Sequence, residues 1–499
     1  MNRAIAGGVL LIAASAQAMA ALRAGVGKAE ITDREAGPVN DPCYARALVL
    51  QDGATTAVLV SVDAVAIGEI GRIPNGYMAS VRSRLKAEAG IAPESLIVNA
   101  SHCHCVVRRD TDALTVEAVK QALRGMTPVR AGAGRGREDR VMENRRVLLK
   151  DGTQADMRRA YTMPPDEEVA AIGPVDPEIG LLRLDKPDGT PFAALYNFAM
   201  HPIMGVPGGG NTADITGFAS QAIEENLGGG PMAFFVQGAG GDINPAKYKN
   251  PFQPHDAEPL GNRLAASALR GLRTIRTRET GPMRLIHEKL TLPRGADLDR
   301  RIAAAKAERE KLVDSIAGTS IDLKTFLALF VQHRISAEFP SHYGHRYAHE
   351  KAAGLDGLAQ MDAENRAEME RYVRNVRAME KIARLKENIS LLEKHRARIV
   401  AEGTSTLDVE VVGLRVGDFA MVTFPGELTV EVGLNVKKRA PGPFSFVAGY
   451  TNGYIYYTAT AAQRNNTGFA QEDCDAMVGP GWQRLFEDKA QSVFERLLK

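Results

Sequence analysis

Cysteine is scarce in this sequence: the 499 residues include only Cys43, Cys103, Cys105 and Cys474. So few and so scattered cysteines exclude a disulfide framework of the kind that holds small secreted domains together. One bridge is compatible with their number, but their spacing does not say which pair would form it. The 44% hydrophobic and 24% charged content is instead that of an ordinary globular protein.

An excess of charge of one sign is also lacking. Lys and Arg together number 62 and Asp and Glu 60, which gives a formal net charge of +2. This balance gives no argument for nucleic acid or for an anionic membrane as a partner. We therefore expect no nucleic-acid binding, and the oligomeric state is left open.

Long hydrophobic runs are missing after residue 20. A membrane helix requires roughly 18 to 20 uninterrupted apolar residues, so we expect no transmembrane segment, although peripheral membrane contact is left open. The first 20 residues carry Arg3, an apolar stretch and Ala18-Met19-Ala20. This layout predicts a cleavable signal peptide over 1–20, a mature chain over 21–499 and a periplasmic or secreted location.

Short apolar, β-branched runs alternate with helical or turn-rich stretches from residue 21 to about residue 293, which predicts an α/β fold with a mixed sheet and helices packed around it. The expected strands cover 55–64, 95–102, 192–202 and 232–242. Each ends in polar residues, in order Asp63, His102 with His104, His201, and Asp242. Ligands bind outside the carboxyl ends of strands in open α/β sheets, so these four endings predict a common rim.

A change of character between 298 and 403 predicts a helical insertion. Apolar residues at 372, 376, 379, 382, 385, 389 and 392 recur at helical spacing, and a shorter helix is expected over 298–317. The connector between them carries His342, His345 and His349, which we interpret as solvated surface residues. After the insertion, 407–433 predicts a β-hairpin that turns at 416–418, with Glu427 just beyond its second strand.

The stretch "SLIVNASHCHCVV", residues 95–107, is unusual because it holds two of the ten His residues. On an extended strand His102 and His104 would share one face, which suggests a metal or proton-transfer site. The alternative is one hydrogen-bonded core His and one solvent-facing His. Catalytic zinc usually takes three His or carboxylate ligands, so His201 and Glu427 extend the candidate set. The alternatives are that His201, which precedes Pro202, fixes a turn and that Glu427 is a carboxylate in the first turn of a helix.

A glycine-rich segment, "VQGAGGDINP" at 236–245, follows the expected strand over 232–242. Such a loop allows the backbone to come close to a ligand. It lacks the Lys-Ser/Thr ending of a phosphate-binding P-loop, so nucleotide binding is weakly supported. It also holds no Ser, Thr or Cys nucleophile.

Several motifs in order resemble the neutral, non-lysosomal ceramidases and their bacterial relatives, which are zinc-dependent amidases. They are "GVGKAEIT", "PCYARALVL", "SHCHC", "ENRR", "NFAMHP", "GAGGDINP", "FPGELT" and "NGYIYY". The resemblance covers the chain from about residue 22 to its end, except the insertion. It implies a single catalytic domain over 21–499, and we expect a short relative that lacks the family's immunoglobulin-like C-terminal domain.

The resemblance implies a small-molecule or lipid substrate, a Zn²⁺ site and the residues around that site. The zinc ligands would be His102, His201, Glu427 and Tyr457, and His104 would handle protons or the oxyanion. Arg145 or Arg146 of "ENRR" would contact the substrate, and we prefer Arg145 because it directly follows Asn144. Asp242 and Asp214 are candidates for orienting the imidazoles.

Two departures bear on the substrate. Asn244 stands where ceramidases carry Ser in the glycine-rich loop, and Cys105-Val106-Val107 replaces the tail of the His motif. We predict a secreted zinc hydrolase that cleaves the amide of an N-acyl, ceramide-like compound with metal-activated water. The alternatives are the same site acting on an ester or a carbohydrate, and a non-catalytic exported binding protein.

Overall fold

A computed structural model describes residues 22–279, 283–468 and 470–499. The predicted signal peptide over 1–20 lies outside these residues. Among the described helices, none is both long and apolar enough to cross a membrane.

The described strands form three larger sheets and three small ones. The first sheet has the order β4 (Leu96–Ala100), β3 (Thr55–Val62), β2 (Tyr44–Asp52), β1 (Arg23–Glu30) and β5 (Thr127–Pro128). The second has β13 (Met232–Gln237), β12 (Pro191–Phe198), β11 (Glu178–Asp185) and β6 (Arg130–Arg137). The third has β15 (Arg284–Pro293), β16 (Thr406–Val416), β17 (Phe419–Thr423) and β19 (Phe444–Ala448). The small sheets pair β10 (Val169–Ile172), β8 (Arg146–Leu149) and β9 (Gln154–Asp156), then β14 (Ile243–Pro245) with β7 (Met142–Asn144), and β18 (Glu427–Leu428) with β20 (Tyr457–Thr458).

Strand directions are mixed, as the sequence predicts. β3 and β4 are parallel, as are β12 and β13, whereas β2 and β3 are antiparallel. Side chains alternate between the two faces of a strand, and both faces of β2 are buried. Leu48 and Leu50 enter the core shared by the three larger sheets, and Ala47 and Val49 pack towards the helices. The fold is therefore α/β.

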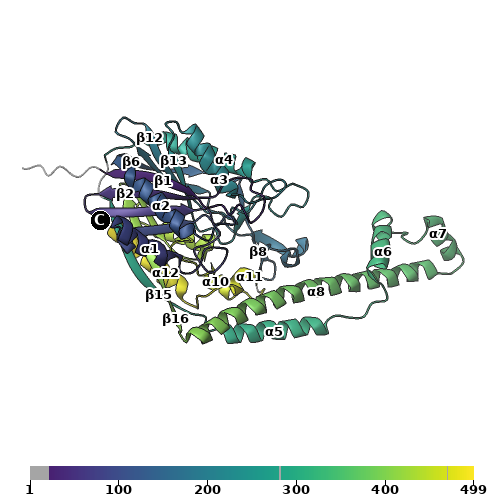
Figure 1. Cartoon of the computed structure of the whole chain (residues 1–499). Coiled ribbons are helices and arrows are strands. Elements are labelled where there is room, and N and C mark those ends of the chain that lie inside the picture. Colours follow the sequence, from purple (N-terminus) through teal and green to yellow (C-terminus); the bar gives the residue numbers. More distant parts are fainter. Residues whose placement is uncertain (1–21, 280–282, 469) are drawn as a thin grey trace, which may run out of the picture.

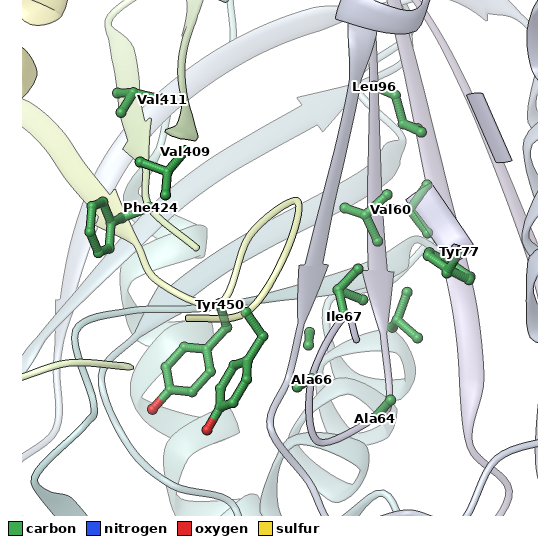
Figure 2. Close-up of a cluster of buried hydrophobic side chains, with 14 of the residues drawn as sticks. Val60, Ala64, Ala66, Ile67, Tyr77, Leu96, Val409, Val411, Phe424 and Tyr450 are labelled. Carbon is green, nitrogen blue, oxygen red and sulfur yellow. The ribbon is translucent and has the colours of Figure 1, made fainter. Parts of the chain in front are cut away.

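Helices cover the outer faces of the sheets (Figure 1). Helices α1 (Tyr77–Ala89) and α2 (Thr111–Arg124) lie on the first sheet, α3 (Asp214–Asn226) and α4 (Ala257–Thr274) on the second, and α9 (Val430–Arg439) and α12 (Trp482–Leu498) on the third. The short helices α10 (Ala461–Arg464) and α11 (Gln471–Cys474) precede α12. Figure 2 shows part of one buried cluster of side chains, with Val60, Leu96 and Tyr77 at the right of the view and Val409, Val411 and Phe424 at the left.

The region 298–403 is helical and extends away from the body as an arm (Figure 1). It consists of α5 (Leu298–Asp314), α6 (Leu323–Ile335), α7 (Gly344–Ala352) and α8 (Gly357–Glu402). Helix α8 has 46 residues, so it is about 70 Å long. The sequence predicts two helices joined by a connector in this region. That prediction is wrong in part, because the connecting stretch contains helices α6 and α7. His342, His345 and His349 are exposed, as interpreted from the sequence.

The hairpin after the arm is confirmed: β16 and β17 pair antiparallel, with Val416 opposite Phe419. The strand expected over 95–102 ends earlier, because β4 stops at Ala100. His102, His104 and the cysteines beside them therefore lie in a loop, and the predicted alternation of faces does not apply to them. This loop is tied to the start of β2 by the disulfide Cys43–Cys105, while Cys103 and Cys474 are buried free thiols.

Candidate metal centre

His102 is fixed by the turn that follows β4. Its backbone has φ of 69°, a left-handed conformation that is uncommon outside glycine, and its N–H donates to the Ala64 carbonyl at 3.0 Å. The ring Nδ1 lies 2.5 Å from the Val65 carbonyl oxygen. Since a carbonyl only accepts, Nδ1 carries the proton and Nε2 presents a lone pair.

His201 is held in the same way from the second sheet. It follows β12 by three residues, and its Nδ1 lies 2.6 Å from the Gly240 carbonyl and 3.1 Å from that of Ile243. Backbone carbonyls therefore orient both imidazoles, and Asp242 and Asp214 do not. Asp214 instead accepts from the N–H groups of Met204 and Gly205, and Asp242 accepts from the N–H of Val430.

Glu427 supplies the carboxylate from β18. It is 1% exposed, and each of its oxygens receives a tyrosine hydroxyl: Tyr450 donates to Oε2 at 3.0 Å and Tyr454 donates to Oε1. These two tyrosines were not predicted from the sequence as parts of the site. The tyrosine-rich segment 450–457 is the signal that could have pointed to them.

Three lone-pair donors converge at this point. His201 Nε2 lies 3.1 Å and His102 Nε2 lies 3.5 Å from Glu427 Oε2, and the ligand atoms of the group all lie within 4.8 Å of one another. His201 Nε2 is buried and has no hydrogen-bond partner among the described residues. Acceptors that face each other in a buried space need a cation between them, so these residues fit a metal ion.

The protonation states suit metal binding. Burial lowers the pKa of His201 to about 3, and burial also lowers the pKa of His102, so both rings are neutral at neutral pH. Burial alone would raise the pKa of Glu427, but His102, His201 and the Tyr454 hydroxyl hold it well below its usual range. Neutral imidazoles and an ionised carboxylate are the forms that bind metal.

The glycine-rich loop brings backbone against backbone below this group. A Cβ on Gly241 would lie 2.6 Å from the Glu427 carbonyl oxygen and 2.9 Å from that of Leu428, while the Gly241 N–H donates to Leu428 at 2.8 Å. Glycine here therefore permits the close packing that places β18 beside His201. Close backbone packing therefore explains the glycine at position 241, and no bound phosphate is needed to explain it.

Tyr457, Arg145 and Asn244 stand next to the metal group. Tyr457 pairs with Glu427 in the parallel β18–β20 ladder, and its hydroxyl accepts from Arg145 Nη2 at 3.2 Å. Arg145 Nη1 donates to Asn244 Oδ1 at 3.1 Å. Burial raises the pKa of Tyr457 above its ordinary value, against the opposing effect of Arg158 and Arg145.

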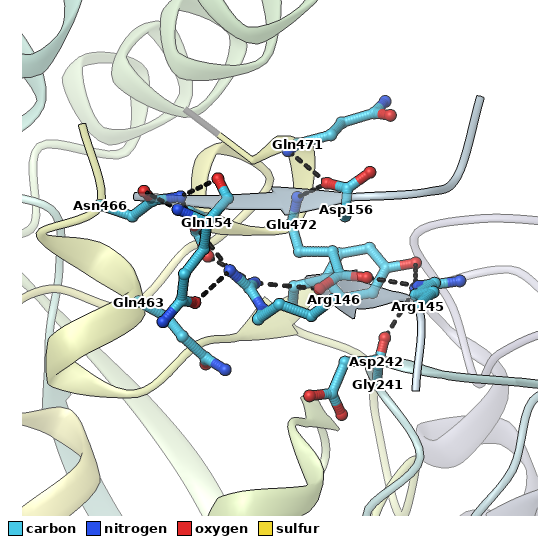
Figure 3. A network of polar contacts seen from close by, with 12 residues as sticks. Arg145, Arg146, Gln154, Asp156, Gly241, Asp242, Gln463, Asn466, Gln471 and Glu472 are labelled. Atoms are coloured by element: carbon cyan, nitrogen blue, oxygen red, sulfur yellow. Dashed lines mark hydrogen bonds and ion pairs between the residues drawn. The ribbon is translucent and has the colours of Figure 1, made fainter. Parts of the chain in front are cut away.

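Arg145 and Arg146 face different surroundings (Figure 3). Both are 4% exposed and both pair with Glu472, but only Arg145 lines the cavity over the metal group. Arg146 turns away to Asp473, at 2.7 Å. Of the two candidates, the structure thus brings Arg145 to the cavity.

The cavity has a volume of about 390 Å³, within the range of small-molecule sites. His104 lies on its wall, its ring centroid 5.8 Å from that of His102, and it remains open to solvent. Partial burial, followed by the neighbouring His102, lowers the pKa of His104 to about 4. His104 is therefore a neutral imidazole able to donate or accept a hydrogen bond.

The helical arm supports another wall of this cavity. Asp475, a lining residue, accepts from His395 Nε2 at 2.7 Å and from Lys394 Nζ at 2.9 Å, both on α8. Arg398 of the same helix pairs with Glu69, which also accepts from the Tyr456 hydroxyl at 3.4 Å. The C-terminal part of α8 thus belongs to the structure of the site.

Three basic residues at the cavity were not identified from the sequence: Arg158, Arg159 and Lys249. Arg158 lies between β9 and the turn at Ala160–Thr162, and its guanidinium stands 4.9 Å from the centre of the Tyr457 ring. Lys249 follows β14 and donates to the Arg158 carbonyl. No motif marks these loops, so only the fold brings them together.

Comparison with solved structures finds ceramidases. The crystal structure of the neutral ceramidase from Pseudomonas aeruginosa matches with a TM-score of 0.58 and 16% identity over 96% of this chain and 75% of that chain. A ceramidase complexed with C2 matches with a TM-score of 0.59 and 16% identity over 96% and 76% of the two chains. No protein-family model and no curated protein sequence matches the chain. The chain therefore shares the fold of the neutral ceramidases.

Proposed function

We propose that this protein is a zinc-dependent hydrolase that cleaves the amide bond of an N-acyl, ceramide-like compound. The observation that carries the proposal is the buried group of His102, His201 and Glu427, whose unprotonated ligand atoms converge below a cavity. The likeness in fold to neutral ceramidases supports the reaction class. Tyr457 is proposed as the fourth ligand, because it is paired with Glu427 in the same ladder.

The residues around the metal group have separate roles in this proposal. When bound, Zn²⁺ would supply the charge that activates water and polarises the substrate carbonyl. His104, a neutral imidazole on the cavity wall, would accept a proton from the attacking water and pass it to the leaving amine. Tyr457 and the amide group of Asn244 would donate to the developing oxyanion, and Arg145 fixes both of them in position.

Export is part of the proposal. The sequence of residues 1–20 supports a signal peptide, and the Cys43–Cys105 bridge suits an oxidising compartment such as the periplasm. The amino-terminal sequence of the mature protein from the producing cells tests this. Cleavage after Ala20 is expected, and a cytoplasmic protein that keeps Met1 would contradict it.

Metal analysis and activity test the central claim. One zinc ion per chain and hydrolysis that stops with a chelator are expected. His102→Ala should lose both metal and turnover, whereas His342→Ala, an exposed His on the arm, should keep them. A purified protein that hydrolyses N-acyl compounds without any metal would overturn the proposal.

A second reaction remains for the same metal group. Asn244 cannot act as a nucleophile, and its place in the cavity favours a substrate other than ceramide, such as an ester or a carbohydrate derivative. Assays against matched amide, ester and sugar panels decide between them. Turnover of esters or sugars with no turnover of ceramide would select the second reaction.

A further inference from the structure

Three basic side chains at the cavity over the metal group have no described carboxylate at ion-pair distance. Arg158, Arg159 and Lys249 line it, and none of them forms an ion pair within the described ranges 22–279, 283–468 and 470–499. The two lining carboxylates are already engaged: Glu427 in the metal group, and Asp475 with Lys394 and His395. Three cations therefore face the cavity without an ion-pair partner among the described residues.

Arg158 has a buried side-chain donor without a hydrogen-bond partner among the described residues. This donor is Nη1, and the guanidinium lies over the Tyr457 ring. A buried donor without an acceptor costs free energy, more so when it is charged. Arg145 repels this guanidinium, whereas Asp156 and Glu472 attract it only from beyond ion-pair distance. An acceptor supplied by a ligand would relieve both effects.

Lys249 adds a second donor at the same place. It donates one hydrogen to the Arg158 carbonyl, which leaves two of its three ammonium hydrogens for other acceptors. Burial, Arg145 and Arg158 lower the pKa of Lys249, which is the direction expected of a cation held among other cations. Lys249 and Arg158 come from loops far apart in sequence, so the fold itself brings this pair together.

We propose that the substrate carries an anionic group, a carboxylate or a phosphate, that is bound by Arg158 and Lys249 with Arg159 beside them. The proposal rests on the proposed hydrolysis of an N-acyl compound and names its substrate class: an N-acyl compound with an acidic head group. A neutral head group would leave the three cations unpaired. The apolar lining residues Val65, Ile70 and Ile203 remain available for the acyl part.

A matched ligand series tests this inference without turnover. N-hexanoylglycine, N-hexanoylethanolamine and the phosphate ester of N-hexanoylethanolamine share an acyl chain and differ in head-group charge. Their binding to the metal-depleted full-length protein is measured by calorimetry. At least one anionic member should bind about tenfold more tightly than the neutral one, as expected for a charged hydrogen-bonded pair. The preferred anion then distinguishes carboxylate from phosphate.

Charge-removing variants complete the test. Lys249→Gln and Arg158→Gln should each remove most of the preference for the anion, while Lys247→Gln, an exposed lysine in the same loop, should keep it. Equal binding of neutral and anionic members, or a preference that survives both variants, would overturn the inference. If the zinc-loaded protein hydrolyses the neutral compound as well as the acidic ones, the inference fails and the hydrolase proposal stands. If the anions bind but no compound is hydrolysed, the hydrolase proposal fails alone.

Discussion

Hydrogen bonds to His102, His201 and Glu427 fix the protonation state and the charge of the metal group. Carbonyl oxygens fix the protons of His102 and His201 on Nδ1, and two hydroxyls polarise Glu427. Such outer contacts orient ligands and tune their basicity, and their loss typically costs 10-fold to 100-fold in metal affinity (order of magnitude). Tyr454 is therefore as much a part of the centre as the carboxylate it binds.

Tyr454→Phe should lower zinc affinity by about 10-fold to 100-fold, because one carboxylate oxygen loses its donor in a buried site. Competition against a chelator of known affinity measures the change. Tyr456→Phe is the matched control: it lies in the same loop, and its hydroxyl bonds to Glu69 and not to Glu427. Equal losses in the two variants would show that the Tyr454 hydroxyl has no special role.

Asp63 gives a pH-dependent prediction away from the metal. Burial raises its pKa from 3.8 to about 6, against the opposing effect of Arg46 and the Tyr44 N–H, with Asp41 and Glu224 adding to the rise. The folded state then holds the proton more tightly than the unfolded state, so stability falls as pH rises from about 4 to about 6. A shift of this size corresponds to about 3 kcal/mol at most.

Asp63→Asn should remove this dependence, because Asn keeps an acceptor for the Tyr44 N–H but does not ionise. Urea unfolding of both proteins at pH 4.5 and pH 7.5 measures it. The stability of the variant relative to the parent should increase by about 1–3 kcal/mol between the two pH values. A constant difference would mean that Asp63 has an ordinary pKa in the folded protein.

The metal group depends on short connections between the sheets. The loop after β13 passes so close to β18 that only glycine fits at position 241. The loop after β4 is tied to β2 by the disulfide. His201, Glu427 and His102 are therefore placed by backbone contacts that a single methyl group can disturb.

Gly241→Ala should reduce both stability and zinc content. The added Cβ meets two backbone carbonyls that cannot rotate away, and overpacking of this kind costs about 1–3 kcal/mol. Gly76→Ala is the control, because a Cβ there meets no atom within 4 Å. Thermal unfolding and zinc stoichiometry of the two variants provide the comparison. Full zinc content in Gly241→Ala would show that β18 can shift without loss of the site.

The strands expected over 55–64, 192–202 and 232–242 correspond to β3, β12 and β13, although each observed strand ends earlier. They could be predicted because apolar runs buried on both faces leave few alternatives. The end of β4 could not be, since the hydrogen bonds that turn the chain at His102 come from Val62 and Ala64, distant in sequence. The metal residues could be proposed from motifs, but which atoms orient them could not. Arg158 and Lys249 lie in loops without periodicity, so their meeting depends on the whole fold.

Helix α6 was missed for a different reason. Its apolar residues do not follow one face, and among its described residues none is buried. Leu327, Val331 and Ile335 are between 52% and 81% exposed. A helix with few packing contacts needs no apolar face, so its sequence shows no amphipathic pattern. The spacing of apolar residues could therefore not distinguish α6 from an irregular connector.

The helical arm has two parts, and only one of them contacts the site. The C-terminal part of α8 contacts the body through Lys394, His395 and Arg398. The distal part, with α6 and α7, extends away from the body (Figure 1). We therefore expect the site to need the first part and not the second.

A truncation tests this division. Asn375 on α8 bonds through its side chain to the backbone of Ala317, with distances of 2.6 and 3.1 Å, so a short Gly-Ser link can replace residues 319–374 without moving either helix. The truncated protein should keep its zinc content and its rate on a water-soluble substrate, because every contact of α8 with the cavity wall is retained. His395→Ala in the full chain is the opposite case: it removes a hydrogen bond to Asp475 at the cavity and should lower the rate. Loss of zinc in the truncated protein, together with normal activity in His395→Ala, would assign the site's support to the distal arm instead.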